Sequence, residues 1–249
     1  MPRYKLTIEY DGAPYQGWQW QDHAPTVQGA LERAAETLNG SPTVVYGAGR
    51  TDSGVHALAM TAHVDFDKDL RPDKVRDAMN YHLHSEAVSV LEADSVPDEW
   101  HARFDAVERA YLYRLIDRRP KLALDKGRVW RLPVKLDADL MHRAAQDLIG
   151  QHDFSTFRDT QCQAKSPIKT LDEITVLRAG AEIHAHLRAR SFLHKQVRSI
   201  VGTLADIGRG HRPETYAKTA LEKQDRKACG QVAPSEGLYL VSVKYGDDT

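Results

Sequence analysis

A short glycine-rich stretch from Gly47 to Met60 combines one arginine and one carboxylate in a tight turn. Three glycines, at positions 47, 49 and 54, let the backbone turn sharply and approach a ligand closely, and they enclose Arg50 and Asp52. A charged tip on such a turn is typical of a binding or catalytic site. An ordinary connection between two elements has the same composition, so the interpretation depends on the rest of the chain.

Two familiar nucleotide-binding motifs do not fit this stretch. No glycine follows Gly49 at the spacing of the dinucleotide fingerprint, and no Gly-Lys-Ser/Thr follows as in a phosphate-binding loop. The tripeptide Asp52-Ser53-Gly54 matches that of aspartic proteases, whose chemistry needs two such carboxylates sharing a proton. The chain has one copy, so only a symmetric dimer would complete that site.

Composition indicates an ordinary globular protein of one large or two small domains. The chain has 249 residues, of which 41% are hydrophobic and 28% charged. Its two cysteines, Cys162 and Cys229, have no metal-like spacing, and we find neither a signal peptide nor a long apolar run. We therefore expect a cytoplasmic protein without disulfides or membrane segments.

The positive charges are concentrated in two regions, although the net charge is −1. Residues 101–131 hold nine Lys/Arg against four Asp/Glu, and residues 184–212 hold six against one, with four histidines. A basic cleft for a phosphate backbone and a merely solvated surface explain this pattern equally well.

Aromatic side chains stand beside polar groups in two places. The segment from Tyr15 to Gln21 interleaves aromatics with amides, which favours either nucleotide contacts or packing on a surface. Further along, Tyr111 and Tyr113 share one face of a predicted strand and are flanked by Arg109 and Arg114. Paired tyrosines usually belong to a core, but beside arginines they also form a base-stacking platform.

Hydrophobic periodicity predicts an α+β fold. The first hundred residues alternate as strand, helix, strand, strand, helix and strand, the order of a ferredoxin-like unit, which RNA-recognition domains also use. The predicted elements there are strands at 4–10, 43–46, 62–66 and 87–91 and helices at 27–39 and 72–81. Because no cysteine or carboxylate lies at metal-ligand spacing from His82 and His84, we interpret this pair as a helix-end loop rather than a metal site.

The second half repeats this order loosely after a boundary near Asp105. The predicted elements are a strand around Tyr111, helices at 137–149 and about 193–207, strands at 168–177, 182–190 and 237–245, and a helix after Pro213. On the 182–190 strand, histidines and arginines share one face. In the 193–207 helix, Arg198 is expected at the edge of the buried stripe, beside Gly202, which would leave room around it. A partly buried arginine needs a carboxylate partner.

These features together resemble the tRNA pseudouridine synthase A family over residues 4–245. The resemblance is carried by eight segments in the same order: Glu9–Gly12, Gly17–Gln19, Gly49–His56, His101–Phe104, Tyr111 with Tyr113, His152–Phe157, Phe192–Arg198 and Glu236–Leu240.

The resemblance implies a fold of two ferredoxin-like halves, with mainly antiparallel sheets, helices on one face and an active-site cleft between the halves. The expected domains are 1–104, with the Asp52 loop, and 105–249. The implied activity is conversion of uridine to pseudouridine at positions 38 to 40 of the tRNA anticodon arm, by a homodimer without metal or other cofactor.

The resemblance also implies a role for each site residue. Asp52 is expected to be the nucleophile and Arg198 its ion-pair partner. Tyr111 is expected to stack on the flipped uracil and assist proton transfer. Arg50 would fill the space of the departed base, and Leu238 would form part of the apolar pocket wall.

This chemistry suits the residue types. Exchanging a C–N for a C–C glycosidic bond needs a carboxylate that attacks covalently or takes a proton from the sugar, while the detached uracil stays in the pocket. Attack at C6 of the base and a glycal route both remain open. The alternative function is a non-catalytic RNA-binding protein on the same sheets, which does not explain a carboxylate on a tight turn. A dimeric aspartic protease is the more distant alternative.

Overall fold

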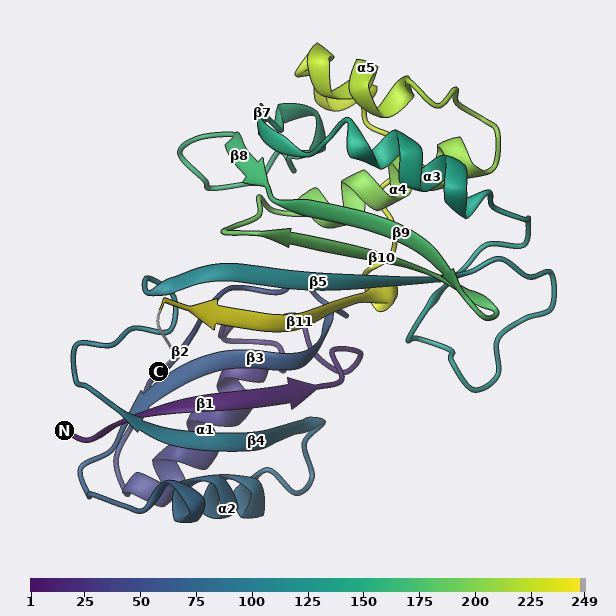
Figure 1. Cartoon of the computed structure of the whole chain (residues 1–249). Helices are drawn as coiled ribbons and strands as arrows, with labels where there is room; N and C mark the ends of the chain where they lie inside the picture. The colour runs from purple at the N-terminus through teal and green to yellow at the C-terminus, as the bar shows by residue number, and fades with distance from the viewer. Residues whose placement is uncertain (247–249) are drawn as a thin grey trace. The chain divides into compact units, whose positions relative to one another are not determined.

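The computed structural model describes residues 1–246, which form a mixed α and β structure with mainly antiparallel strands (Figure 1). The chain divides into two compact units. Among the described residues, the first contains 1–107 and 239–246, and the second contains 108–238. None of the helices within residues 1–246 is long and apolar enough to cross a membrane.

The sheet of the first unit is built on three antiparallel strands in the order β4-β1-β3. They are β1 (Arg3–Tyr10), β3 (His56–Asp65) and β4 (Val88–Val96). The short strand β2 (Val45–Gly47) pairs antiparallel with β3, and β11 (Leu238–Tyr245) pairs parallel with it. Alternate residues of β1 are buried from Tyr4 to Tyr10, which confirms the predicted period of two.

Two helices of the first unit form at the predicted positions. The helix α1 (Val27–Asn39) begins after Thr26, whose side-chain oxygen accepts the N–H of Gly29 at 3.1 Å, and ends at Gly40 with φ of 81°. The helix α2 (Pro72–His82) begins with its proline. Both helices pack behind and below the strands in Figure 1, and α2 contacts β4.

Strands β3 and β4 are longer than predicted. The strand β3 begins at His56 rather than Ala62, and β4 continues to Val96 rather than ending at Leu91. Residues 60–64 of β3 are all buried, including the polar Thr61 and His63, so this part of the strand is covered on both faces.

The sheet of the second unit has the antiparallel order β5-β10-β9. These strands are β5 (Ala106–Ile116), β9 (Glu173–Ala179) and β10 (Glu182–Ala189), and the short β6 (Trp130–Arg131) pairs parallel with β5. The single strand predicted at 168–177 is instead two strands. The strand β8 (Ile168–Leu171) pairs with β7 (Gly150–Asp153), and the chain changes partner at Asp172, whose N–H donates to Arg188 O at 2.9 Å.

Three helices lie on one side of this second sheet (Figure 1): α3 (Ala138–Gln146), α4 (Gln196–Gly208) and α5 (Tyr216–Lys223). The helix α4 begins later than predicted because Lys195 has a left-handed φ of 59°. Almost all of α4 is buried, including Ser199 and Thr203, so burial extends beyond the predicted apolar stripe.

The two compact units and the two predicted domains divide the chain differently. The break between the units falls after Val107, and the chain from Tyr239 belongs to the first unit because β11 pairs with β3. The predicted second domain also included residues 247–249, which lie outside the described residues.

Candidate active site

The loop that carries Arg50 and Asp52 joins β2 to β3 in the first unit. Arg50 is exposed and Asp52 is half-buried. The loop closes in a turn, in which Val55 N–H donates to Asp52 O at 3.1 Å and Gly54 has a φ of 77°. A side chain at Gly54 would therefore strain the backbone next to Asp52.

The other two glycines of this stretch differ in what surrounds them. A Cβ at Gly47 would lie 2.5 Å from the ring of Trp18, so this glycine admits the indole. A Cβ at Gly49 would meet no heavy atom within 4 Å. The backbone before Arg50 thus faces open space, as a loop that receives a ligand requires.

The segment from Tyr10 to Trp18 holds the Asp52 loop in place. The Trp18 N–H donates to Thr51 O at 3.1 Å, and the hydroxyl of Tyr10 lies 2.8 Å from that of Thr51. On the other side of Asp52, the N–H of Gly54 donates to Tyr15 O at 3.4 Å. Asp52 is therefore placed by hydrogen bonds to the residues on both sides of it.

A second close approach fixes the end of the loop. A Cβ at Gly12 would lie 2.0 Å from Val55 O, and the Gly12 N–H donates to Nδ1 of His56 at 3.1 Å. The imidazole of His56 stacks on Tyr239 with ring centroids 4.7 Å apart. The Asp-Gly turn after β1 is thus part of the support of this loop as well as the end of a strand.

The aromatics between Tyr15 and Gln21 have two different roles. Tyr15 and Trp18 are each only 2% exposed and belong to the core, so for these two the packing interpretation is correct. Burial and the hydrogen bond to Glu86 hold the pKa of Tyr15 well above its ordinary value. Trp20 is 50% exposed and remains available to stack on a base.

In the second unit, Tyr111 lies on β5 opposite Leu187 of β10 and is half-buried. Its ring meets Phe192 edge to face, with centroids 5.2 Å apart. The neighbouring Tyr113 is fully buried, and its hydroxyl donates to Pro234 O at 2.7 Å. Burial raises the pKa of Tyr113 well above its ordinary value, so its hydroxyl stays protonated.

Arg198 lies in the first turns of α4 and is half-buried. Its Nε donates to Ala233 O at 2.8 Å, and the Ala233 N–H donates back to Arg198 O at 3.0 Å. The prediction that Gly202 leaves room beside Arg198 is wrong, because a Cβ there would lie 1.8 Å from Gln231 O. The glycine instead admits the backbone that holds Arg198. Leu238, a few residues after Ala233 in the chain, is buried and is the first residue of β11.

The basic face of β10 is balanced by carboxylates. Arg188 lies 2.7 Å from Glu108 and 3.2 Å from Glu173. On β5, Arg114 donates two hydrogen bonds to Glu182, of 2.9 and 2.7 Å, which hold the pKa of that carboxyl below its ordinary value. Part of the positive charge seen in the sequence is therefore used inside the unit.

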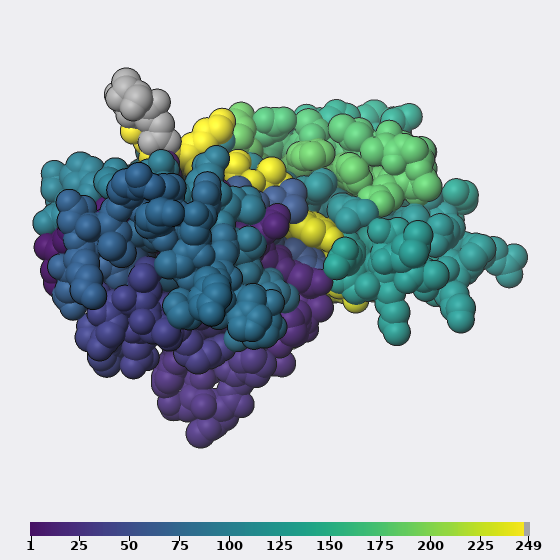
Figure 2. All heavy atoms as spheres, turned by 90° about the horizontal axis from the view of Figure 1, so that it is seen from below, coloured from purple at the N-terminus to yellow at the C-terminus, as the bar shows by residue number. Residues whose placement is uncertain are grey.

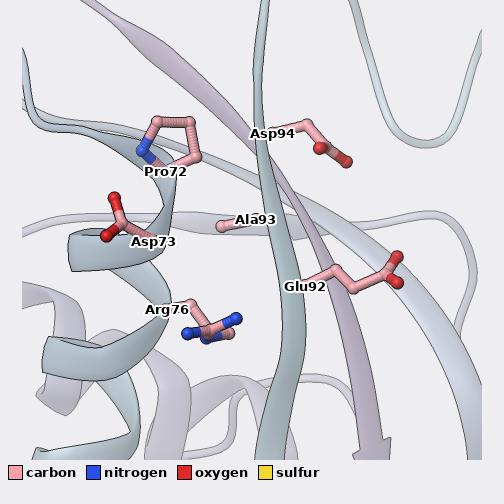
Figure 3. Close-up of a pocket in the computed structure, with 6 residues that line it drawn as sticks. All are labelled: Pro72, Asp73, Arg76, Glu92, Ala93 and Asp94. Atoms are coloured by element: carbon pink, nitrogen blue, oxygen red, sulfur yellow. The ribbon is translucent and has the colours of Figure 1, made fainter.

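A polar hollow of about 340 Å³ lies between the start of α2 and the edge strand β4. Figure 3 shows Ala93 directed toward α2, with Glu92 and Asp94 directed away from it. In Figure 2 the blue residues of this region form part of the surface of the first unit. Three carboxylates and one arginine line the hollow, so it does not suit a phosphate, and it contains no predicted site residue.

The structure therefore brings Arg50 and Asp52 together on one loop of the first unit, and it places Tyr111, Arg198 and Leu238 in the second. The ion pair between Asp52 and Arg198 stays a prediction. The sequence analysis missed Thr51 and Ala233 as supports. Their contacts run mostly through backbone atoms, which leave no mark on residue type.

Comparison with known proteins shows the family to which the chain is similar. The family model described as tRNA pseudouridine synthase matches residues 6–105 and 144–246. A protein of Maricaulis maris named tRNA pseudouridine synthase A is 62% identical over 98% of both chains. Proteins of the same name from a Bradyrhizobium species and from Caulobacter vibrioides are 58% and 56% identical, over 98% and 99% of this chain and 100% of theirs.

Identity at this level over nearly the whole chain sets aside the protease and the non-catalytic RNA-binding alternatives. The chain belongs to the tRNA pseudouridine synthase family, and it is an isomerase of RNA modification.

Proposed function

We propose that this enzyme converts uridine to pseudouridine at positions 38 to 40 in the anticodon arm of tRNA, with Asp52 as the nucleophile. The observation that carries the proposal is the Asp52 loop. The residues on both sides of Asp52, Thr51 and Gly54, are held by hydrogen bonds, and the backbone at Gly49 is open to a ligand. A fixed carboxylate beside an open surface suits attack on a bound nucleotide.

The reaction follows from the residues proposed for the site. The C1′–N1 bond of the uridine breaks, the uracil rotates while it stays bound, and C1′ bonds to C5. The C5 proton then leaves to solvent and N1 takes up a proton, so the product is an isomer of the substrate. Tyr111 provides a π-face for the uracil and a phenol to assist this proton transfer. Arg198 favours the ionised form of Asp52, Arg50 occupies the place of the flipped nucleotide, and Leu238 lines the pocket.

The larger-scale parts of the proposal rest on element order and on the resemblance. The first unit runs β1-α1-β2-β3-α2-β4, which supports one ferredoxin-like half. The second runs through β5, α3, β9, β10 and α4, which supports another. We propose that the enzyme acts in the cytoplasm as a homodimer without a cofactor. Light scattering should give twice the mass of one chain.

The test is tritium release from tRNA that carries uridine labelled at C5, since isomerisation replaces that hydrogen. The wild-type enzyme should release tritium from uridines at 38 to 40. Asp52→Asn is nearly isosteric, so it should bind tRNA within about threefold of wild type yet show no turnover, because the amide is not a nucleophile.

A matched control is Asp67→Asn, which changes an exposed aspartate of the same unit and should leave turnover intact. Multiple turnover by pure Asp52→Asn would overturn the assignment of the nucleophile. Tritium release only from uridines outside positions 38 to 40 would overturn the proposed target.

A further inference from the structure

One segment of the second unit contacts each of the elements that carry its proposed site residues. We call Cys229–Leu238 the strap. It runs along α4, where Gly230 N–H donates to Oγ1 of Thr203 at 3.0 Å and Ala233 exchanges two hydrogen bonds with Arg198. It then reaches β5, where Pro234 O accepts the hydroxyl of Tyr113 at 2.7 Å.

Glycines allow the strap to pack this close to α4 and β5. A Cβ at Gly202 on α4 would lie 1.8 Å from Gln231 O, and one at Gly230 would lie 2.8 Å from Cα of Thr203. A Cβ at Gly237 would lie 2.7 Å from the ring of Tyr113. These neighbours are backbone atoms or a buried ring, so none of them can yield without moving the strap.

The contacts with Ala233 determine how Arg198 presents its charge. A guanidinium is planar and rigid, so a hydrogen bond from Nε restrains the direction of Nε–H and, with it, the positions of both Nη groups. The reciprocal bond from Ala233 N–H to Arg198 O ties the same strap residue to the helix backbone. The position of Ala233 therefore sets the orientation of the guanidinium.

The hydroxyl of Tyr113 anchors the next residue of the strap. Tyr113 is fully buried and lies two positions from Tyr111 on the same face of β5. Its bond to Pro234 O connects the strand that carries Tyr111 to the strap that holds Arg198. The strap then continues to Leu238 within four residues.

We propose that the strap is the positioning element of the active site, and that Tyr113 and Gly202 are positioning residues that act on catalysis by fixing Ala233 against Arg198. This inference rests on the proposed role of Arg198 in turnover. Tyr113 itself touches no reacting atom in this account.

The first test is Tyr113→Phe, which removes one hydroxyl and creates no cavity. The strap loses its anchor at Pro234, so we expect kcat for tritium release to fall about tenfold while KM for tRNA stays within twofold. The matched control is Tyr245→Phe in the first unit, whose hydroxyl donates to Ala102 O at the same 2.7 Å. It should lose similar stability and keep the wild-type kcat.

The second test is a double-mutant cycle that separates positioning from stability. Gly202→Ala should lower kcat more than Tyr113→Phe, because its Cβ displaces Gln231. In an Arg198→Met background, measured by single-turnover tritium release over hours, neither variant should lower the rate further. Their effects on the melting temperature should be the same in both backgrounds.

The two proposals fail in different ways. Near-normal turnover by Arg198→Met would overturn the role of Arg198 and so the premise. An inactive Arg198→Met together with a wild-type kcat for Tyr113→Phe would overturn only the proposed role of the strap. So would a further rate loss when Tyr113→Phe or Gly202→Ala is added to Arg198→Met. Should Gly202→Ala fail to fold, the Tyr113→Phe comparison decides.

Discussion

At the scale of single residues, Tyr111 has a ring that can stack and a hydroxyl that can transfer a proton, and a substitution can remove the hydroxyl alone. Phe192 holds the ring edge to face, and that contact does not depend on the hydroxyl. We expect Tyr111→Phe to bind tRNA nearly as wild type does and to lose activity by orders of magnitude, since only the group that assists proton transfer is gone.

The measurement for Tyr111→Phe is tRNA affinity by filter binding beside tritium release. Tyr113→Phe, with its smaller expected loss, is the internal comparison on the same strand. A wild-type rate for Tyr111→Phe would reduce Tyr111 to a packing residue.

Trp20 is the exposed aromatic residue of the Tyr15–Gln21 segment. Its backbone N–H donates to Oε1 of Gln28 on α1 at 3.0 Å, and the side-chain amide of Gln21 donates to Gln16 O at 3.1 Å, so the chain around Trp20 is tied to α1 and to the segment that supports Asp52. Stacking on a base contributes about 1–3 kcal/mol by alanine substitution. We therefore expect Trp20→Ala to raise KM for tRNA about tenfold with little change in kcat.

Two variants sharpen the experiment on Trp20. Trp20→Phe keeps an aromatic face and should keep most of the affinity. Tyr81→Ala removes a side chain on α2 that is 76% exposed and should have no effect on KM. Equal KM values for Trp20→Ala and wild type would assign Trp20 to the protein surface alone.

At the scale of elements, predictions were confirmed where local signals determine structure. Thr26 and Gly40 bound α1 because a side-chain oxygen and a left-handed glycine act within a few residues. Alternation located β1 and β10 because each has one buried face. Tertiary contacts decided the rest. The change of partner at Asp172 and the left-handed Lys195 have no local signal strong enough to predict them.

The same division applies to the candidate site. The Asp52 loop is visible in the sequence because it needs glycines and charged residues close together. The support of Arg198 is not visible, because Ala233 is 35 residues away and contributes only backbone atoms. Gly202 drew attention in the sequence, but its reason is the carbonyl of Gln231 rather than open space.

The burial of β3 on both faces has a consequence for acid stability. His63 is 1% exposed, its Nδ1 accepts the N–H of Ala102 at 3.2 Å, and its ring stacks on Tyr46. Burial, with the nearby charge of Arg3, lowers the pKa of His63 to about 4. Protonation of His63 would also turn Nδ1 from an acceptor into a donor, which would then face the donating N–H of Ala102.

The direction of the effect follows from the lowered pKa of His63. Between an ordinary pKa of about 6.5 and the folded value of about 4, the unfolded chain binds a proton that the folded chain does not. Stability from this group is present at neutral pH and is lost as pH falls through this window. The loss by pH 4.5 is on the order of 2–3 kcal/mol.

Between pH 7 and pH 4.5, we expect the free energy of unfolding of His63→Asn to fall by about 2–3 kcal/mol less than that of wild type. The amide oxygen of Asn can accept the Ala102 N–H and does not titrate. Urea unfolding at both pH values measures the difference. His84→Asn changes an exposed histidine of the same unit and is the control. Equal losses in wild type and His63→Asn would contradict this assignment.

At the scale of the whole molecule, the affinity for tRNA should depend on salt less steeply than the count of basic residues suggests. Several cations of the basic regions already have carboxylate partners, among them Arg114 and Arg188. The exposed segment between β5 and β6 is different, since Arg118, Arg119 and Lys121 are exposed there within four positions. We therefore expect this segment to supply phosphate contacts.

The salt dependence of binding tests that expectation. Each neutralised phosphate contributes a slope of about −0.7 to −0.9 in log K against log salt. The double variant Arg118→Gln with Arg119→Gln should make the slope shallower by about 1.4 to 1.8, with kcat at saturating tRNA unchanged. Arg71→Gln with Lys74→Gln removes two exposed cations beside the acidic hollow at α2 and should leave the slope as it is. An equal slope in all three proteins would mean that other cations contact the phosphates. A wild-type affinity that does not depend on salt would contradict binding of the RNA backbone by basic residues.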